Sequence, residues 1–316
     1  MMQRAQLTES HCPVLSDEVI GLLNAHNGGK FLDCTFGGGG HSEAMLHANG
    51  ENFVYAIDCD PDAKKRAQEF SLRHKNFRFY RINFVEVQCL PLPPLSGILM
   101  DLGVSSFQLD EEWRGFSFKF HAPLDMRMDN GSGITAEKFL RTADERDLTT
   151  AIRDYGEEEQ WKKIVRAIVE NRTSDAMGHG DTFAKFVANC IGKPQPSGIH
   201  PATKVFHGIR IFINDELNSL EAALPAMFDK LAVGGRLAVI SFHSLEDRIV
   251  KRFFNAVAGK AIDRFDGRSH MDRVAYGNIV TKSPVTPSGR EVENNPRSRS
   301  AKLRVIEKIH NSGGAK

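Results

Sequence analysis

A run of four glycines, residues 37–40, stands between a short apolar segment and a helix-forming segment, and it constrains the fold more than any other feature of the chain. Glycine lets a backbone approach a ligand closely, and the first turn of the following helix presents N–H groups that have no intrahelical partner. In a doubly wound α/β sheet, such a loop lies in the ligand crevice at the carboxyl ends of the strands. The glycines alone leave a simple flexible turn open as the alternative.

Short segments rich in Val, Ile, Phe and Tyr alternate with segments of helical periodicity around this loop. The pattern predicts strands over residues 30–36, 52–58, 77–82 and 97–101. It predicts helices over residues 16–24, 42–48 and 61–74, the last with a proline in its first turn after an aspartate cap. This alternation is typical of a parallel sheet with crossover helices, so we expect a doubly wound, Rossmann-like α/β core.

The connection to the next buried strand, residues 236–241, is too long for a simple crossover, which usually takes a few tens of residues. A long helix over residues 209–231 is expected just before that strand. Helical periodicity at residues 136–140, 145–155, 158–171 and 182–190 indicates that the excess forms a small helical domain. We therefore predict a core of residues 1–108 and 204–316 and an inserted helical domain of residues 109–203 that recognises the substrate.

The remaining composition excludes several classes of protein. The longest apolar runs are far shorter than the roughly 20 residues that cross a bilayer, and the first residues lack the apolar middle of a signal peptide. We therefore expect no membrane association and a cytoplasmic location. The five cysteines include no C-x-x-C pair, so neither a disulfide framework nor a metal site is expected.

Charge is unevenly distributed along the chain. Residues 241–316 hold 15 Lys and Arg against 8 Asp and Glu, whereas the first 240 residues are net acidic. A basic C-terminal quarter favours a polyanionic partner, although a solvated basic surface explains the charge equally well.

Acidic residues follow the predicted strands at the edge where the glycine loop lies. Asp58 ends the second strand about 20 residues after the glycines, where a carboxylate accepts both hydroxyls of a ribose. A nicotinamide-dependent dehydrogenase has the same feature. Asp33, just before the loop, favours the cationic amine of S-adenosylmethionine over a pyrophosphate, which a carboxylate repels. Asp101 follows Ile98–Leu99–Met100, and an acid at the end of a buried strand is costly unless it serves a site.

Seven sequence blocks occur together in the order found in one family. They are HCPVL (residues 11–15), FGGGGHS (36–42), DLGVSSFQLD (101–110), RGFSF (114–118), PLDMRMD (123–129), SFHSLEDR (241–248) and NPRSRSAKLR (295–304). With these blocks the chain resembles the MraW-type ribosomal RNA small-subunit methyltransferase H family from His11 to about Lys308.

The resemblance implies methyl transfer from S-adenosylmethionine to the exocyclic N4 of a cytidine in the decoding centre of 16S ribosomal RNA. The expected partner is this RNA within the small ribosomal subunit. The resemblance also implies cofactor contacts, in addition to Asp33, at the following residues: Gly39, Gly40, His41, Asp58, Phe84, Asp101 and Gln108. Neither an oligomeric state nor the form of the RNA follows from the sequence.

The cytidine amine is a poor nucleophile, and an acceptor near its N–H groups would help it to react. Many amino methyltransferases of bases carry a Pro-Pro-aromatic motif after the acid, whereas here Asp101 is followed by Leu-Gly-Val. Asp125 and His243 are therefore additional catalytic candidates beside Asp101. His243 as a helix cap is the alternative that we weigh against this role.

The basic tail supplies the predicted RNA contacts, and they are Arg297, Arg299, Lys302 and Arg304. Leu303, Val305 and Ile309 indicate an edge strand, whose charges also guard against aggregation, so we expect a mixed role. Two rival functions remain at this stage, a nicotinamide-dependent dehydrogenase and a non-catalytic ribosome-assembly factor. Comparative binding of NAD and S-adenosylmethionine separates the first, and loss of a methylated cytidine in a deletion strain separates the second.

Overall fold

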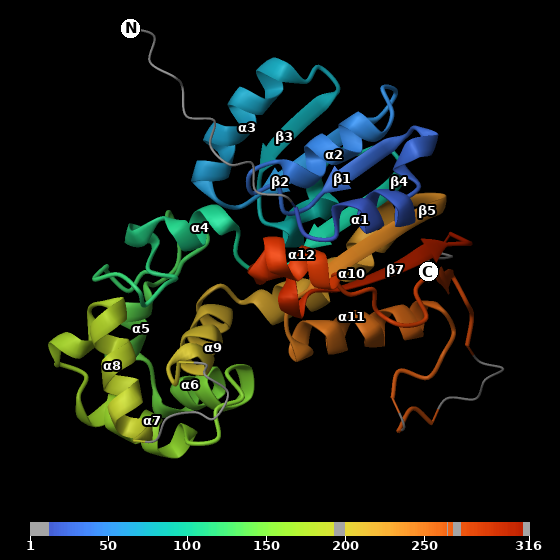
Figure 1. Ribbon diagram of the computed structural model, residues 1–316. Helices are drawn as coiled ribbons and strands as arrows, with labels where there is room; N and C mark the ends of the chain where they lie inside the picture. The colour runs from blue at the N-terminus through green and yellow to red at the C-terminus, as the bar shows by residue number, and fades with distance from the viewer. Residues whose placement is uncertain (1–12, 193–199, 264, 268–272, 312–316) are drawn as a thin grey trace, which may run out of the picture. The chain divides into compact units, whose positions relative to one another are not determined.

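The computed structural model describes residues 13–192, 200–263, 265–267 and 273–311. The chain divides into two compact units. Unit 1 consists of Met1–Asp58, Asp62–Gly103 and Glu221–Lys316, and unit 2 of Cys59–Pro61 and Val104–Leu220 (Figure 1). No helix among the described residues is long and apolar enough to cross a membrane.

Unit 1 contains a seven-stranded sheet in the order β3-β2-β1-β4-β5-β7-β6. Its strands are β1 (Lys30–Asp33), β2 (Phe53–Asp58), β3 (Phe77–Arg81), β4 (Leu95–Asp101), β5 (Leu231–Ser241), β6 (Gly277–Ile279) and β7 (Lys302–Lys308). The first five strands pair in parallel, whereas β7 is antiparallel to both β5 and β6. This architecture confirms the predicted doubly wound α/β core.

The parallel register brings the acidic strand ends to one edge of the sheet. Asp33 pairs with Ala56 of β2 and Leu99 of β4, and β2 and β4 end just beyond these residues at Asp58 and Asp101. Carboxyl ends of parallel strands are where doubly wound sheets bind their ligands. The three aspartates that the sequence singled out therefore share the edge that the fold predicts for a site.

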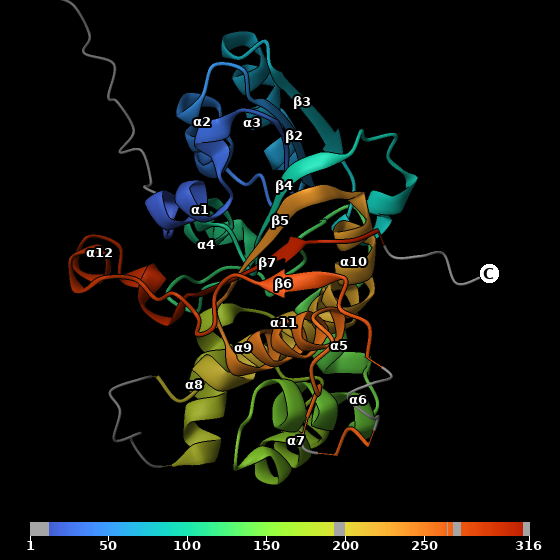
Figure 2. The same ribbon diagram turned by 90° about the vertical axis from the view of Figure 1, so that its right-hand side faces the viewer.

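Helices cover both faces of this sheet because alternate strand residues point to opposite sides. One face packs against α1 (Ser16–Leu22), α2 (Gly40–Ala48) and α3 (Pro61–Arg73), around buried residues such as Phe31 and Phe70. On the other face, α11 (Ser244–Val257) contacts β5, β6 and β7 (Figure 2). The C-terminal part of α10 (Glu216–Lys230) also belongs to unit 1, and Lys308 of β7 donates to its Asp229 carbonyl at 2.9 Å.

The C-terminal strand lies in a different position from the one expected. The sequence predicted an edge strand, but β7 is an interior strand between β5 and β6. Its Leu303, Val305 and Ile306 are fully buried. The prediction was wrong because the strand that pairs with the outer side of β7 gives little sequence signal. This strand, β6, has only three residues, and two of them, Gly277 and Asn278, are neither apolar nor β-branched.

Unit 2 is largely helical. Its helices are α4 (Ser106–Asp110), α5 (Ala136–Thr142), α6 (Glu145–Thr149), α7 (Trp161–Glu170), α8 (Gly180–Ile191) and α9 (Thr203–Ile213), with a π-helical turn η4 (Thr150–Tyr155) after α6. They surround a second apolar core that includes Phe139, Ile152 and Phe183. A Cβ at Gly208 of α9 would lie 2.0 Å from the Ala151 carbonyl oxygen, so α9 and η4 approach closely only because this residue is glycine.

Unit 2 extends beyond the predicted insertion of residues 109–203 at both ends. Helix α9 packs on η4 and α5, which places residues up to Leu220 in this unit. The single long helix predicted over residues 209–231 is in fact two helices, α9 and α10. They are separated at Asn214 and Asp215, and Asp215 has a left-handed φ of 48° that ends the helical path.

Candidate active site

A chain of hydrogen bonds joins the ends of β1 and β4 with the start of α2. The Thr35 N–H donates to Asp33 Oδ1 at 3.1 Å, and the Thr35 hydroxyl oxygen accepts from the Asp101 N–H at 2.8 Å. Ser42 Oγ donates to the other oxygen of Asp33, Oδ2, at 2.7 Å. The chain fixes the Asp101 backbone relative to the glycine loop.

Asp33 is a buried carboxyl, only 1 % exposed. Burial raises the pKa of Asp33, and the nearby His41 opposes this rise. Both of its oxygens accept bonds from within unit 1, and a raised pKa disfavours the charge that a cationic amine would require. Its role as an amine ligand stays a prediction, and its observed contacts make it a brace for the loop.

Buried polar atoms without partners gather around Asp101. Asp101 Oδ1 and both ring nitrogens of His41 are buried and find no hydrogen-bond partner among the described residues. His41 Nε2 lies 3.6 Å from Asp101 Oδ2, which is an ion-pair distance but too long for a hydrogen bond. Buried polar groups are nearly always satisfied, so these atoms indicate where a ligand binds.

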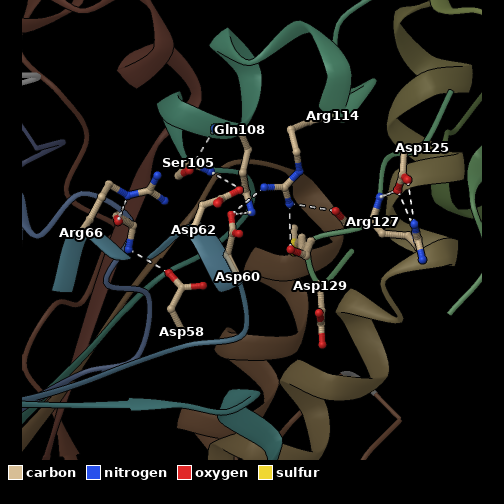
Figure 3. A network of polar contacts seen from close by, with 12 residues as sticks. Asp58, Asp60, Asp62, Arg66, Ser105, Gln108, Arg114, Asp125, Arg127 and Asp129 are labelled. Carbon is tan, nitrogen blue, oxygen red and sulfur yellow. Dashed lines mark hydrogen bonds and ion pairs between the residues drawn. The ribbon is translucent and has the colours of Figure 1, made fainter. Parts of the chain in front are cut away.

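The glycine loop is held in place through Gly37. Its N–H donates to Asp58 Oδ2 at 2.8 Å, and its carbonyl oxygen accepts from Arg66 Nε of α3 at 2.8 Å (Figure 3). Gly39 caps α2 with a φ of 84°, and a Cβ there would lie 2.8 Å from the Phe36 ring. The loop thus requires glycine at residue 39, and Asp58 both braces the loop and stands at the edge of the sheet.

Two other candidates follow β3 and β5, the two outermost strands of the parallel part of the unit 1 sheet. Phe84 is half-buried and begins the short 3-10 helix after β3. His243 follows β5 and precedes α11, and its Nε2 lies 3.1 Å from Glu246 Oε1. Glu246 Oε2 also accepts from the Phe242 N–H at 2.9 Å, so the carboxylate of Glu246 caps this helix. His243 occupies the capping position that we had weighed as its alternative role.

In unit 2, Gln108 belongs to a buried polar cluster. Gln108 Nε2 and Arg114 Nη1 each donate to Asp60 Oδ2 at 2.9 Å, and Gln108 Oε1 accepts from the Ser105 N–H at 2.9 Å. Asp60, Gln108 and Arg114 are 1 %, 5 % and 1 % exposed. The amide of Gln108 is therefore oriented by neighbours on both of its polar atoms.

Asp125, also in unit 2, pairs with Arg127. Arg127 Nε donates to Asp125 Oδ1 and Nη2 to Oδ2, both at 2.8 Å. The carboxylate of Asp125 holds the pKa of Arg127 above its usual value. A base at residue 125 would have to act while it remains bound by this guanidinium.

The model of the MraW methylase family matches residues 8–309. The chain belongs to the MraW methylase family. It is 42% identical over 309 residues to the ribosomal RNA small subunit methyltransferase H of Granulibacter bethesdensis, covering 95% of this chain and 92% of that protein. It is 43% identical over 310 residues to the protein of the same name from Thiobacillus denitrificans, covering 96% and 99%.

Among solved structures, an rRNA methylase from Streptococcus thermophilus aligns with a TM-score of 0.41 at 11% identity, covering 93% of this chain and 94% of that one. The family membership confirms the resemblance seen in the sequence. It also confirms a methyltransferase that uses S-adenosylmethionine, in place of the dehydrogenase alternative.

The residues at the edge of the unit 1 sheet fit this cofactor. Asp58 would supply a carboxylate for ribose hydroxyls, and Phe84 would offer an apolar ring at the next strand end. The unpartnered polar atoms of His41 and Asp101 would be available to the other polar groups of the cofactor. Gly39 and Gly40 allow a close approach of the loop backbone.

Thr35, Ser42 and Asp60 are not among the predicted site residues, yet they bind Asp101, Asp33 and Gln108. Asn214 was not predicted either, and it binds the backbone of Met128 in the loop that follows Asp125. Arg114 was noted only as part of the RGFSF block. A signal existed for Thr35 and Ser42, since both flank the glycine loop with hydroxyl side chains. The sequence marks Asp60 only as the cap before the proline of α3, and nothing in it indicates that Asp60 is buried against Gln108 and Arg114.

The basic tail contains two exposed arginines and two basic residues next to Asp247. Arg297 and Arg299 are exposed on the short 3-10 helix before β7. Arg304 of β7 binds Asp247 of α11 through two hydrogen bonds, of 2.6 and 3.1 Å, and is only 12% exposed. Lys302 Nζ lies 3.9 Å from the same carboxylate. Arg297 and Arg299 are thus the tail residues best placed for a phosphate contact.

Proposed function

We propose that this methyltransferase transfers a methyl group from S-adenosylmethionine to the exocyclic N4 of a cytidine in the decoding centre of 16S ribosomal RNA. The observation that carries the proposal is the buried, unpartnered Asp101 Oδ1 at the end of β4. A carboxylate oxygen in that position is an acceptor suited to an N–H group. The names of the relatives support the small-subunit ribosomal RNA as the substrate.

The cofactor supplies a methyl group already activated on a sulfonium, so the protein has chiefly to align the reacting atoms. Asp58 and the glycine loop would hold the nucleoside part, and Gly37 keeps the two in register. Asp101 Oδ1 would accept a hydrogen bond from the cytidine amine or from the cofactor. The bond from the Asp101 N–H to Thr35 orients Asp101 for this contact. An acceptor at the amine localises its lone pair and makes nitrogen more nucleophilic.

His243 and Asp125 are proposed as further groups near the base. The register pairs Asp101 with Ile240 of β5, so His243, three residues later, follows the adjacent strand end. Asp125 is held rigidly by Arg127. The cytidine has to be single-stranded or flipped out to reach such groups, and the helical unit 2 is proposed to help recognise the RNA around it.

Methyl transfer from labelled S-adenosylmethionine to small-subunit particles and to naked 16S RNA tests the proposal. Mass mapping of the RNA should place the label on one cytidine, at N4, and the same modification should be absent from a strain lacking the gene. Label on another base would overturn the assignment of the target. Retention of every methylated cytidine in the deletion strain would favour a non-catalytic assembly factor, acting in the cytoplasm where subunits are built.

A further inference from the structure

Arg114 is the largest of the fully buried side chains, although arginine is rarely buried unless it is paired. Its guanidinium donates hydrogen bonds in two directions (Figure 3). Nη1 donates to Asp60 Oδ2, and Nη2 donates to the carbonyl oxygens of Arg127 at 2.9 Å and Met128 at 2.8 Å. One rigid planar group therefore contacts two separate segments of unit 2.

The Asp60 contact orients Gln108. Gln108 Nε2 and Arg114 Nη1 donate to the same oxygen of Asp60, so the carboxylate lies between the amide and the guanidinium. The positive charge of Arg114 compensates the buried charge of Asp60 and keeps it available as an acceptor for Gln108. Removing Arg114 would take away the guanidinium that holds Asp60 Oδ2 at 2.9 Å, so the carboxylate and the amide bound to it could reorient.

The carbonyl contacts hold the loop next to Asp125. Met126 has a left-handed φ of 62°, which a residue other than glycine rarely adopts. The Met126 N–H donates to the Arg114 carbonyl at 2.9 Å, and its carbonyl accepts from Asn214 Nδ2 at 2.8 Å. Asn214 Oδ1 accepts from the Met128 N–H at 2.7 Å.

The backbone of residues 126–128 is thus fully hydrogen-bonded, because the remaining Arg127 N–H donates to Asp125 Oδ1 at 3.1 Å. Backbone held this way in an uncommon conformation is a feature of functional sites, where the surrounding structure fixes the geometry. Besides the adjacent Asp125, the side chains of Arg114 and Asn214 hold the backbone of this loop.

We propose that Arg114 is a positioning residue. Its guanidinium fixes the orientation of the Gln108 amide and also the conformation of residues 126–128, the loop beside Asp125. The inference rests on the proposed function for the roles of Gln108 at the cofactor and Asp125 at the base. In this proposal Arg114 acts through Gln108 and the loop and not on a ligand directly. The side chain of Asn214 contacts the loop and the Arg210 carbonyl of its own helix, but not the Asp60–Gln108 pair, which makes it the matched control.

The experiment compares Arg114→Met, Arg114→Lys and Asn214→Ala. Affinity for S-adenosylhomocysteine, which is the cofactor without its methyl group, is measured by calorimetry well below each melting temperature. Steady-state methyl transfer to small-subunit particles gives kcat and KM. Asn214→Ala should keep the parent's affinity for S-adenosylhomocysteine and lower kcat, because it loosens the loop and leaves the contacts of Asp60 with Gln108 and Arg114 in place.

Arg114→Met should lower both quantities, each by roughly 10- to 100-fold, the loss expected for a hydrogen bond to a charged group. Arg114→Lys keeps the charge beside Asp60, but a compact ammonium cannot donate to both segments as the planar fork does. Arg114→Lys should therefore recover part of the affinity for S-adenosylhomocysteine or part of kcat, but not both. If Arg114→Met fails to fold, Arg114→Lys provides the test.

The proposal is overturned if both Arg114 variants fold and bind S-adenosylhomocysteine as the parent does. It is also overturned if Asn214→Ala weakens this binding as much as Arg114→Lys does, since the two contacts would then not be separable. Calorimetry needs no RNA, so a wrong substrate assignment leaves this result intact. Failure of the proposed function appears separately, as parent protein that methylates no small-subunit RNA.

Discussion

The hydroxyl oxygen of Thr35 accepts a 2.8 Å hydrogen bond from the backbone N–H of Asp101, which ties the ends of β1 and β4 together. The Thr35 N–H in turn donates to the buried Asp33. Asp101, whose carboxylate is proposed to accept a hydrogen bond from the reacting amine, is therefore oriented through its backbone N–H by Thr35, next to the glycine loop. This contact makes Thr35 the most direct way to disturb Asp101 without altering its side chain.

Replacing Thr35 with Val should lower both stability and methyl transfer. The substitution preserves the side-chain shape but leaves the Asp101 N–H without its acceptor, a loss of about 1–3 kcal/mol in unfolding free energy. Chemical denaturation measures the first effect and kcat the second. Thr35→Ser, which retains the hydroxyl, is the control and should remain near the parent. Parent-like turnover in Thr35→Val would show that this bond does not orient Asp101.

Asp33→Asn should remove a pH dependence of stability. Burial raises the pKa of Asp33 above the value of 3.8 for an ordinary aspartate. Between those two values the folded state binds one proton more than the unfolded state, so the unfolding free energy falls as pH rises through the window. The parent should therefore gain stability relative to Asp33→Asn as pH is lowered toward 3.8, by up to about 1.4 kcal/mol per pH unit.

Urea unfolding of both proteins across that pH range gives the difference directly. Only the difference between the two curves is interpreted, because other acids titrate in both proteins. Ser42→Ala serves as a second probe, since it removes the donor to Asp33 Oδ2 and leaves the carboxyl in place. Parallel curves for the parent and Asp33→Asn would mean that Asp33 has the same pKa folded and unfolded.

Asp58→Ala should weaken S-adenosylmethionine binding. The variant loses a charged acceptor for ribose hydroxyls, at about 1.5–3 kcal/mol per bond, and also the brace on the Gly37 N–H. Calorimetry measures the affinity. Glu69→Gln, at an exposed site on α3, is the control for a general effect of charge. An unchanged affinity in Asp58→Ala would remove this residue from the cofactor site.

Replacing Arg297 and Arg299 together with Ala should reduce RNA affinity and flatten its dependence on salt. Each exposed arginine that contacts a phosphate contributes about one unit to the log–log slope, so a decrease of up to about two is expected. Affinity for S-adenosylmethionine should stay at the parent's value. A paired change of Lys64 and Lys75 to Ala, also exposed, controls for total charge.

Binding to small-subunit particles at several salt concentrations provides both quantities. If the arginine variant keeps the parent's affinity and slope, the tail makes no phosphate contact and the RNA is held elsewhere. Arg304 offers a complementary case, because its pairing with Asp247 predicts a stability loss rather than a salt effect when it is replaced.

The strands that build the site could be predicted because their apolar runs are short, continuous and followed by an acid. Asp33, Asp58 and Asp101 stand where the sequence placed them, at the carboxyl ends of neighbouring parallel strands. The interior position of β7 could not be predicted. The apolar side chains of a strand indicate that its faces are buried, but they do not show whether its backbone pairs with one neighbouring strand or with two. That information comes only from the tertiary structure.

Arg114 shows a second limit of sequence reasoning. An arginine between Trp113 and Gly115 in an acidic stretch reads as a surface residue by every rule of composition. Its burial depends on Asp60, 54 residues earlier, and on backbone carbonyl groups, which every residue has and which therefore give no sequence signal. Its partners were therefore invisible until the chain was folded, although the block that contains it was recognised.

The sheet of unit 1 has a consequence for how the protein is made. Strand β5 pairs with β7 close to the end of the chain, and the Leu15 N–H donates to Glu291 Oε1 across 276 residues of sequence. A nascent chain cannot form these contacts until residues 291–307 have left the ribosome, whereas residues 104–220 of unit 2 are contiguous and emerge earlier. We expect unit 2 to become protease-resistant first on stalled nascent chains, with the glycine loop and its three aspartates held open until the last strand arrives.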